Sequence, residues 1–390
     1  MTIRRVPEDF RVVERLAPGV VRERPDKHAV FTLTKRSLAT PEAVAKLAEA
    51  LGVRAGDVAY CGLKDKHALT TQHVSVPAAA AGKTIEPQPG WSAGRVGFSP
   101  GPLAAADIEA NEFTIVVRGL TLDASERIDR HARMLDAGEG SLAFVNYFGE
   151  QRFGSARHGG GFVARRLIEG DFEGALRLAI ATPARKDTGA KRAFTRGAAS
   201  GWGDWTRLAA ELPRHPHRRA VEHLAAEPGD FKGAFALLPN FEQQMFVDAY
   251  QSHLWNLTAA ALVRSLDAPA FETGGERGAL AFVPASALVP ALRGIEVPVP
   301  RPGMRFGGPW GEHARAVLAA EGLDADRLTI PGLRRPSFGG DTRPLVASAR
   351  GFSITEPAPD GFSPRHAART LRFALGRGSY ATVLLRALGQ

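Results

Sequence analysis

The chain has 390 residues, a length that favours two or three domains over a single core. Its hydrophobic and charged fractions, 44% and 23%, are ordinary for a globular protein. A single cysteine excludes a disulfide framework and a cysteine-rich metal site. The net charge of +9 suits a phosphate-bearing partner, although a general arginine and alanine bias explains it equally well. The chain begins without an apolar leader and has no run near ~18 apolar residues, so we expect a cytoplasmic protein without membrane contact.

The first third of the chain alternates strand and helix patterns. A helix is predicted at 40–52, with Thr40 as the N-cap, Pro41 in the first turn and Gly52 at the C-terminal end. We expect its apolar stripe to pack on the sheet that carries the next connection. The other elements predicted here are an entry turn and strand at 7–14, strands at 28–35, 68–76, 95–98 and 112–118, a surface loop at 78–94, and a helix at 125–137.

Residues 61–72, CGLKDKHALTTQ, carry the most chemical information. Asp65 lies between Lys64 and Lys66, whose ammonium groups favour the ionised carboxylate. An ionised carboxylate in a strand connection can act as a nucleophile or a base. A solvated charged turn can contain the same KDK triplet, so the triplet alone does not decide between the two interpretations.

A second informative stretch, VNYFGEQRFG, spans residues 145–154. Its aromatic rings can stack on a base, Asn146 can read a base edge, and Arg152 can bind a phosphate. An aromatic-rich strand end packed in a core has the same composition. For Arg152 itself, a structural role and a phosphate contact both stay open.

The remainder of the chain contains fewer distinctive signals. The basic segment at 182–220 is either an RNA-backbone contact or a solvated surface. His215, His217 and His223 lack ligand partners at suitable spacing, so we expect no metal site there. A long core helix is predicted at 240–266. A strand at 370–375 precedes a helix at 380–388 capped by Ser379.

Four stretches together resemble the TruD family of tRNA pseudouridine synthases: PEDFRV at 7–12, GLKDKHALTTQ at 62–72, NYFGEQRFG at 146–154 and SYATVLLR at 379–386. The family signature G-x-K-D-x-x-A-x-T-x-Q places the nucleophile at Asp65. The resemblance also places four residues at the uridine pocket, Phe10, Asn146, Phe148 and Tyr380. It favours Lys64 as the cation that keeps Asp65 ionised in the substrate site. The family pattern has phenylalanine at the position of Tyr380, so its phenolic oxygen needs a partner or water.

The resemblance implies an α+β fold. A pseudouridine-synthase catalytic domain, with a mixed and largely antiparallel sheet, would comprise residues 1–171 and 351–390. An α/β TRUD domain would be inserted at 172–350. The strand patterns at both ends of the chain and the long helix between them agree with this arrangement.

The implied reaction converts a uridine of tRNA, expected to be uridine 13 of the D arm, to pseudouridine. Because isomerisation consumes nothing, we expect no metal and no organic cofactor. The nucleotide must leave its stack to reach Asp65. Whether Asp65 attacks the ribose, attacks the base or removes a ribose proton stays open, as do the oligomeric state and the set of tRNAs.

Two other classes compete with this interpretation. One is a catalytically silent RNA-binding chaperone on the same scaffold, against which the intact Asp65 motif argues. The other is an aspartate-nucleophile hydrolase of a small substrate. The positive charge and the lack of a second catalytic carboxylate or metal motif weigh against the hydrolase.

Overall fold

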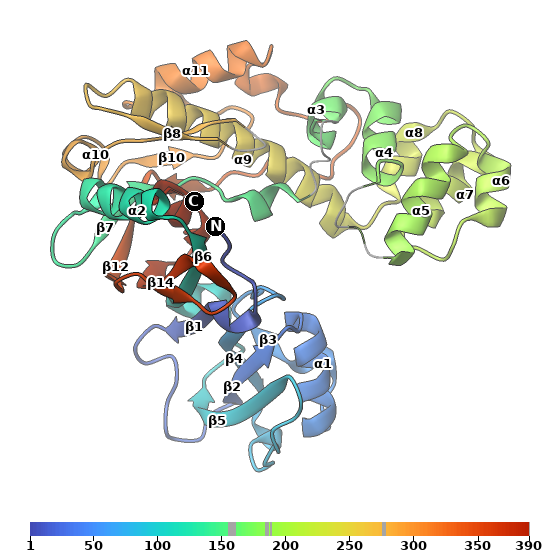
Figure 1. The fold of residues 1–390 in the computed structure, drawn as a ribbon. Coiled ribbons are helices and arrows are strands. Elements are labelled where there is room, and N and C mark those ends of the chain that lie inside the picture. The colour runs from blue at the N-terminus through green and yellow to red at the C-terminus, as the bar shows by residue number, and fades with distance from the viewer. Residues whose placement is uncertain (155–160, 184–186, 188, 275–277, 390) are drawn as a thin grey trace. The chain divides into compact units, whose positions relative to one another are not determined.

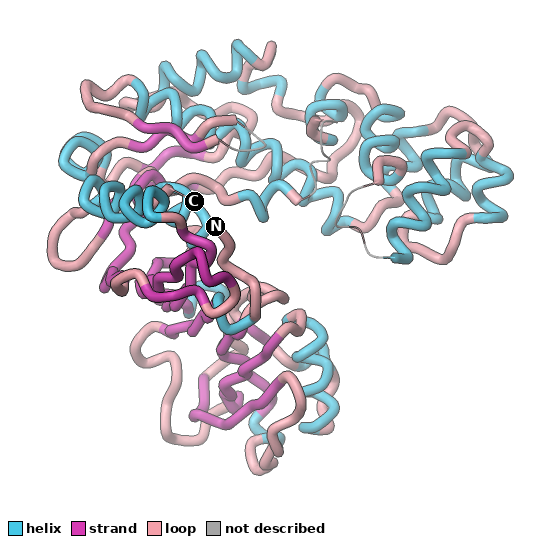
Figure 2. Tube along the Cα trace, viewed as in Figure 1, coloured by secondary structure: helices cyan, strands magenta, loops and turns pink. Residues whose placement is uncertain are grey.

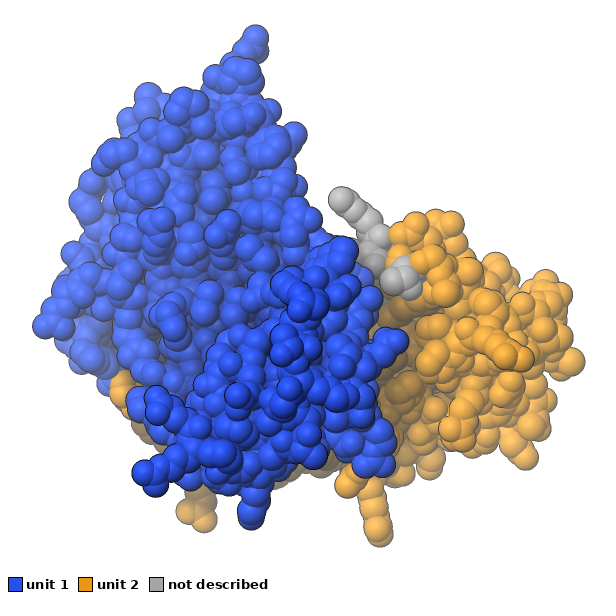
Figure 3. Space-filling view, turned by 90° about the horizontal axis from the view of Figure 1, so that it is seen from below, with its two compact units in different colours: residues 1–146, 283–293, 346–390 blue, residues 147–282, 294–345 orange. Residues whose placement is uncertain are grey.

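The computed structural model describes residues 1–154, 161–183, 187, 189–274 and 278–389. These residues form two compact units (Figure 3). Unit 1 comprises residues 1–146, 283–293 and 346–390, and unit 2 comprises residues 147–282 and 294–345. The domain boundaries predicted at 172 and 350 stay a prediction beside this geometric division. Across the described ranges, no helix is both long and apolar enough to cross a membrane.

Unit 1 is built on one ten-stranded sheet. Its strands are β1 (Phe10–Leu16), β2 (His28–Arg36), β3 (Ala59–Tyr60), β4 (Leu69–Pro77), β5 (Trp91–Ser99), β6 (Ile108–Leu120), β7 (Leu142–Val145), β12 (Val346–Ile354), β13 (Ala358–Asp360) and β14 (Ser363–Gly376). The main path runs β5–β2–β4–β1–β6–β14–β12–β7, with β3 on β4 and β13 on β14. Only the β1–β4 pair on this path is parallel. The predicted mixed, largely antiparallel sheet is therefore confirmed.

The two ends of the chain meet in the middle of this sheet. β6 pairs with β1 on one side and with β14 on the other. The register sets Phe113 opposite both Val12 and Phe373. Segments more than two hundred residues apart in sequence thus lie side by side in one sheet.

Helix α1 (Thr40–Leu51) covers one face of β2 and β4 (Figure 1). Its buried Leu47 packs into a cluster with Phe31 and Leu33 of β2 and Val74 of β4. Gly52 ends the helix at φ 64°, in the left-handed region that glycine adopts without a Cβ penalty. The other helices of this unit are α2 (Leu122–Leu135), α10 (Ala285–Leu292) and α12 (Ala381–Ala387).

Helices predominate in unit 2 (Figure 2). They are α3 (Val163–Ile168), α4 (Phe172–Ile180), α5 (Gly189–Ser200), α6 (Trp205–Glu211), α7 (Arg218–Ala226), α8 (Phe231–Ala236), α9 (Asn240–Arg264) and α11 (Gly311–Ala320). Two two-stranded antiparallel sheets accompany them, formed by β8 (Phe271–Thr273) with β9 (Leu280–Phe282) and by β10 (Glu296–Pro298) with β11 (Thr342–Pro344). The predicted core helix at 240–266 is confirmed as α9.

Several predicted element ends are wrong. The N-cap of α1 is Ala39 rather than Thr40, because the Thr40 hydroxyl bonds the Asp65 loop instead. The N-cap of α12 is Tyr380 rather than Ser379, whose N–H instead donates to Gly376 O in the preceding turn. The predicted surface loop at 78–94 is also too long, because β5 begins at Trp91, which pairs with Lys35 of β2.

We expect Leu47→Ala to destabilise unit 1 by about 2–5 kcal/mol, because the cavity cannot collapse between a helix and a sheet. Urea unfolding followed by circular dichroism measures this change. Glu49→Ala on the exposed face of α1 is the matched control, with an expected effect within about 0.5 kcal/mol. Equal effects of the two substitutions would contradict the packing of Leu47 against β2 and β4.

Candidate active site

Buried polar side chains brace the loop that carries Asp65. The Thr40 hydroxyl accepts a hydrogen bond from Lys64 N at 3.0 Å and donates to Gln72 Oε1 at 3.0 Å. The Gln72 amide donates in turn to Gly62 O at 3.2 Å. Because Thr40 and Gln72 are both buried, these bonds form in a low dielectric where they hold the loop firmly. The final glutamine of the 62–72 motif therefore shapes the loop.

The Asp65 carboxylate has a fixed orientation and remains partly open to solvent. Arg4 Nη2 lies 2.7 Å from Asp65 Oδ2, and His67 N donates to Asp65 Oδ1 at 2.8 Å. The side chain is 21% exposed. The guanidinium contact orients the carboxylate, and the exposure leaves room for an approaching group. Sequence analysis did not identify Arg4, which lies 61 positions away in a basic N-terminal segment.

The Lys64 ammonium contacts Glu14 rather than Asp65. Lys64 Nζ lies 2.5 Å from Glu14 Oε2, in a pair whose side chains are 8% and 0% exposed. Glu14 Oε1 also accepts from His73 N at 2.8 Å. Burial alone would raise the pKa of Glu14, but interactions with His73 and Lys64 outweigh it, and the pKa falls below its usual value. Lys66 pairs with Glu42 at 3.5 Å at the surface, so the cation paired with the Asp65 carboxylate among the described residues is Arg4.

Arg4 also joins Phe10 to Asp65. Its guanidinium carbon lies 4.5 Å from the centroid of the Phe10 ring, a cation–π contact. The Phe10 ring meets Phe113 edge-on at 6.1 Å, and Phe113 stacks on Phe373 at 5.3 Å. Three central strands therefore hold one aromatic row, and Arg4 connects the first member of that row to the carboxylate.

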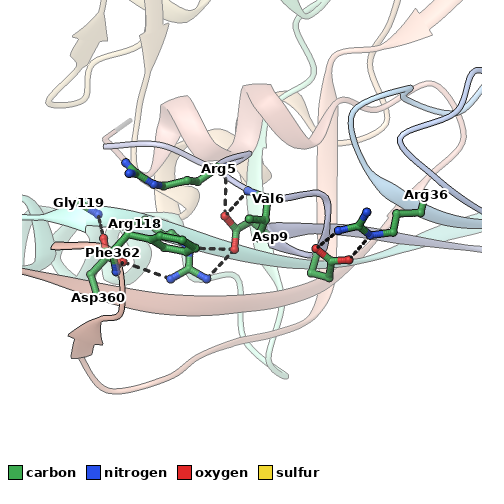
Figure 4. A network of polar contacts seen from close by, with 9 residues as sticks. Arg5, Val6, Asp9, Arg36, Arg118, Gly119, Asp360 and Phe362 are labelled. Atoms are coloured by element: carbon green, nitrogen blue, oxygen red, sulfur yellow. Dashed lines mark hydrogen bonds and ion pairs between the residues drawn. The ribbon is translucent and has the colours of Figure 1, made fainter. Parts of the chain in front are cut away.

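A buried polar network fixes the segment before Phe10 (Figure 4). Asp9 Oδ2 accepts from the backbone N–H of Arg5 and Val6, at 3.1 and 3.2 Å. Asp9 Oδ1 pairs with Arg118 Nη2 at 2.7 Å, and Arg118 continues to Asp360 at 3.2 Å. The aspartate of the PEDF motif thus ties the N-terminal segment, and with it Arg4, to β6 and to the end of β13.

Two further predicted site residues belong to unit 1 together with Asp65. Asn146 is buried directly after β7, and Tyr380 is half-buried directly before α12. The structure thus collects Phe10, Asn146 and Tyr380 in the unit that contains Asp65.

Phe148 belongs to unit 2, where helix α9 holds it. Asn256 Oδ1 accepts from Phe148 N at 2.8 Å, and Asn256 Nδ2 donates to Phe148 O at 3.0 Å. The Phe148 ring meets Trp255 edge-on at 5.5 Å and lies 4.2 Å below the guanidinium of Arg343. A single amide side chain therefore satisfies both backbone groups of Phe148.

Arg152 of the same stretch is also bound to α9. It donates to Ser252 Oγ at 3.2 Å and pairs with Asp248 at 3.2 Å. Residues 248–256 of α9 thus form the face that binds residues 148–152. Sequence analysis had assigned this part of the helix a structural role alone.

Two histidines of the cluster formed by His215, His217 and His223 have carboxylate partners, contrary to the sequence-based expectation. His217 lies 2.7 Å from Glu242 and His223 lies 2.8 Å from Asp230. Glu242 lies 25 positions from His217, whereas Asp230 lies only 7 positions from His223, and the sequence analysis identified neither pair. In the part of the chain that the structure describes, no group of three or more histidine, cysteine or acidic residues could hold a metal ion.

Comparisons with known proteins agree with this architecture. A family model described as tRNA pseudouridine synthase D (TruD) matches residues 1–270 and 294–388. The chain therefore belongs to this family of isomerases, and both the predicted family and the predicted α+β pseudouridine-synthase fold are confirmed.

Relatives cover nearly the full chain. The probable tRNA pseudouridine synthase D 2 of Methanocaldococcus jannaschii is 29% identical over 99% of this chain and 91% of its own length. The tRNA pseudouridine synthase D of Aquifex aeolicus is 30% identical over 99% and 97%. The crystal structure of a putative TruD protein from Methanosarcina mazei matches with a TM-score of 0.73 and 26% identity, over 99% and 92% of the two chains.

We expect Glu14→Gln to destabilise the protein by about 3 kcal/mol or more near neutral pH, because it leaves the buried Lys64 ammonium without its counter-ion. The folded-state pKa of Glu14 is lowered, so its charge stabilises the fold above the usual value of 4.5 and loses this effect as the pH falls below it. The melting temperatures of wild type and Glu14→Gln should therefore converge in acid.

Glu112→Gln is the matched control, since it breaks an exposed pair with Arg15. Its expected cost is below about 1 kcal/mol at every pH. A gap between wild type and Glu14→Gln that widens in acid would contradict the assignment of Glu14.

Proposed function

We propose that this chain isomerises a uridine of tRNA to pseudouridine, with Asp65 as the catalytic carboxylate. Family membership supports the reaction and the class of substrate. The observation that supports Asp65 is its carboxylate, which Arg4 and His67 N orient while the side chain stays 21% exposed. By family resemblance, the target is uridine 13 in the D arm.

The chemistry assigns a separate task to each group. The N1–C1′ bond breaks, the uracil turns in place, C5 bonds to C1′, the C5 proton leaves, and N1 gains a proton. Each possible role of Asp65 begins from the carboxylate anion, which the Arg4 guanidinium stabilises at 2.7 Å. A uridine flipped out of its stack needs aromatic and polar contacts, for which we propose Phe10, Asn146 and Tyr380.

Two predicted residues receive a narrower role. Lys64, paired with Glu14, acts on the site through the loop that it shares with Asp65 rather than by direct contact with the carboxylate. Phe148 stays the predicted uridine contact of the second motif. Asn256 binds both backbone groups of Phe148 and so fixes the position from which its ring extends.

We expect wild type to release tritium from tRNA labelled at uridine C5, and Asp65→Ala to release none, because bond formation at C5 expels that hydrogen. Asp65→Asn is the matched variant, since it keeps the shape and removes the charge. Carbodiimide modification with primer extension then maps the product to position 13 or elsewhere.

Each result decides between explicit alternatives. Release by Asp65→Ala would keep the activity and remove the catalytic role from Asp65. Failure of wild type to release tritium from any tRNA, with tight binding retained, would favour an RNA-binding chaperone.

We expect Tyr380→Phe to retain activity within about threefold, and Tyr380→Ala to lose about 10-fold or more, because the ring supplies stacking of about 1–3 kcal/mol on the base. Single-turnover rates at saturating enzyme measure both. A large loss in Tyr380→Phe would instead assign the phenolic oxygen a direct role.

A further inference from the structure

Lys35 occupies a position on β2 where an apolar residue is expected. Ala29, Phe31 and Leu33 alternate along this strand and are buried in the cluster beneath α1. Lys35 continues the same alternation and is 0% exposed. Burying an ammonium group is strongly unfavourable unless its hydrogen bonds are satisfied. A lysine on the buried face of this strand therefore needs a structural or chemical reason.

The ammonium of Lys35 lies directly beneath the loop that carries Asp65. Its Nζ donates to Asp65 O at 2.8 Å and to Lys64 O at 3.3 Å. Both acceptors are backbone carbonyls of consecutive residues at the tip of the loop. Hydrogen bonds from a charged donor are about twice as strong as neutral ones, so the two bonds fix the backbone on which the carboxylate is mounted.

We propose that Lys35 is a positioning residue for catalysis, whose charged ammonium fixes the main chain of Lys64 and Asp65 and thereby the location of the Asp65 carboxylate. This inference rests on the proposed function, in which Asp65 carries out the chemistry. A shift of about 1 Å in a reacting group can cost about 100-fold in rate, so a positioning group at this place has a large effect.

The charges around Lys35 predict a distinct pH dependence. Burial and, to a smaller extent, the nearby charge of Lys64 lower the pKa of Lys35 to about 8, against opposing effects of Asp65 and Glu42. Each of these neighbours has its own partner, since Asp65 pairs with Arg4, Lys64 with Glu14 and Glu42 with Lys66. The ammonium is therefore charged at neutral pH and loses its proton in mild alkali, where its hold on the loop weakens.

The test is the single-turnover rate of pseudouridine formation between about pH 6.5 and 9.5 in wild type, Lys35→Met and Lys35→Gln. The wild-type rate should fall as the pH rises through about 8. Lys35→Met should be about 100-fold slower at neutral pH and independent of pH in this range, with tRNA affinity changed less than about threefold. Lys35→Gln keeps a neutral N–H donor, so it should recover part of the rate and stay independent of pH.

Lys46→Met is the matched control, because Lys46 lies on the exposed face of α1. It should keep both the wild-type rate and the alkaline fall. If Lys35→Met does not fold, as thermal unfolding would reveal, the wild-type profile and Lys35→Gln still test the proposal.

Three results would overturn it: a wild-type rate that does not fall up to about pH 9.5, the same alkaline fall in either Lys35 variant, or a wild-type rate in Lys35→Met. Activity of Asp65→Ala is a separate result, which rejects the proposed function itself whatever Lys35→Met does.

Discussion

The ion pair between Arg4 and Asp65 is the contact on which the candidate site depends. It joins the N-terminal segment to a loop between β3 and β4, and it places the same guanidinium over the Phe10 ring. An ion pair this exposed contributes little to stability by itself, because water screens it and two long side chains lose freedom. Its importance is geometric: one cation orients the carboxylate and a flanking aromatic together.

The rigidity of this pair comes from buried groups behind it. Asp9 and Arg118 hold the segment that carries Arg4, whereas Thr40, Gln72 and Lys35 hold the loop that carries Asp65. The segments that carry Arg4 and Asp65 are thus each held by a buried hydrogen-bond network. In such a low dielectric, hydrogen bonds are strong and an unpaired polar group is costly. The exposed carboxylate can remain accessible because the structure beneath it supplies the order that catalysis requires.

The sequence predicted the elements better than it predicted the contacts. Periodic patterns were sufficient for α1, α9 and most single strands, because these patterns are local, whereas the mixed sheet was expected from the family resemblance. Arg4 had no local signal, since one arginine in a basic segment resembles any other. Glu14 and Lys35 did have one: each continues the buried alternation of its strand, so each is a charged residue at a core position. Buried charges require partners, so both residues could have been marked from the sequence as members of a buried polar network, although not with their partners.

Helix α9 shows why its role was harder to predict. It is buried on most sides, so its apolar residues do not form a single stripe that separates core from solvent. Its buried polar residues, among them Ser252 and Asn256, are unfavourable in a core helix unless they have hydrogen-bond partners. Those partners are Arg152 and the backbone of Phe148, about 100 positions earlier in the chain. An irregular segment cannot satisfy the hydrogen bonds of its own backbone groups. A helix that supplies the missing partners must carry polar residues on its buried face, which interrupts the regular spacing of its apolar residues.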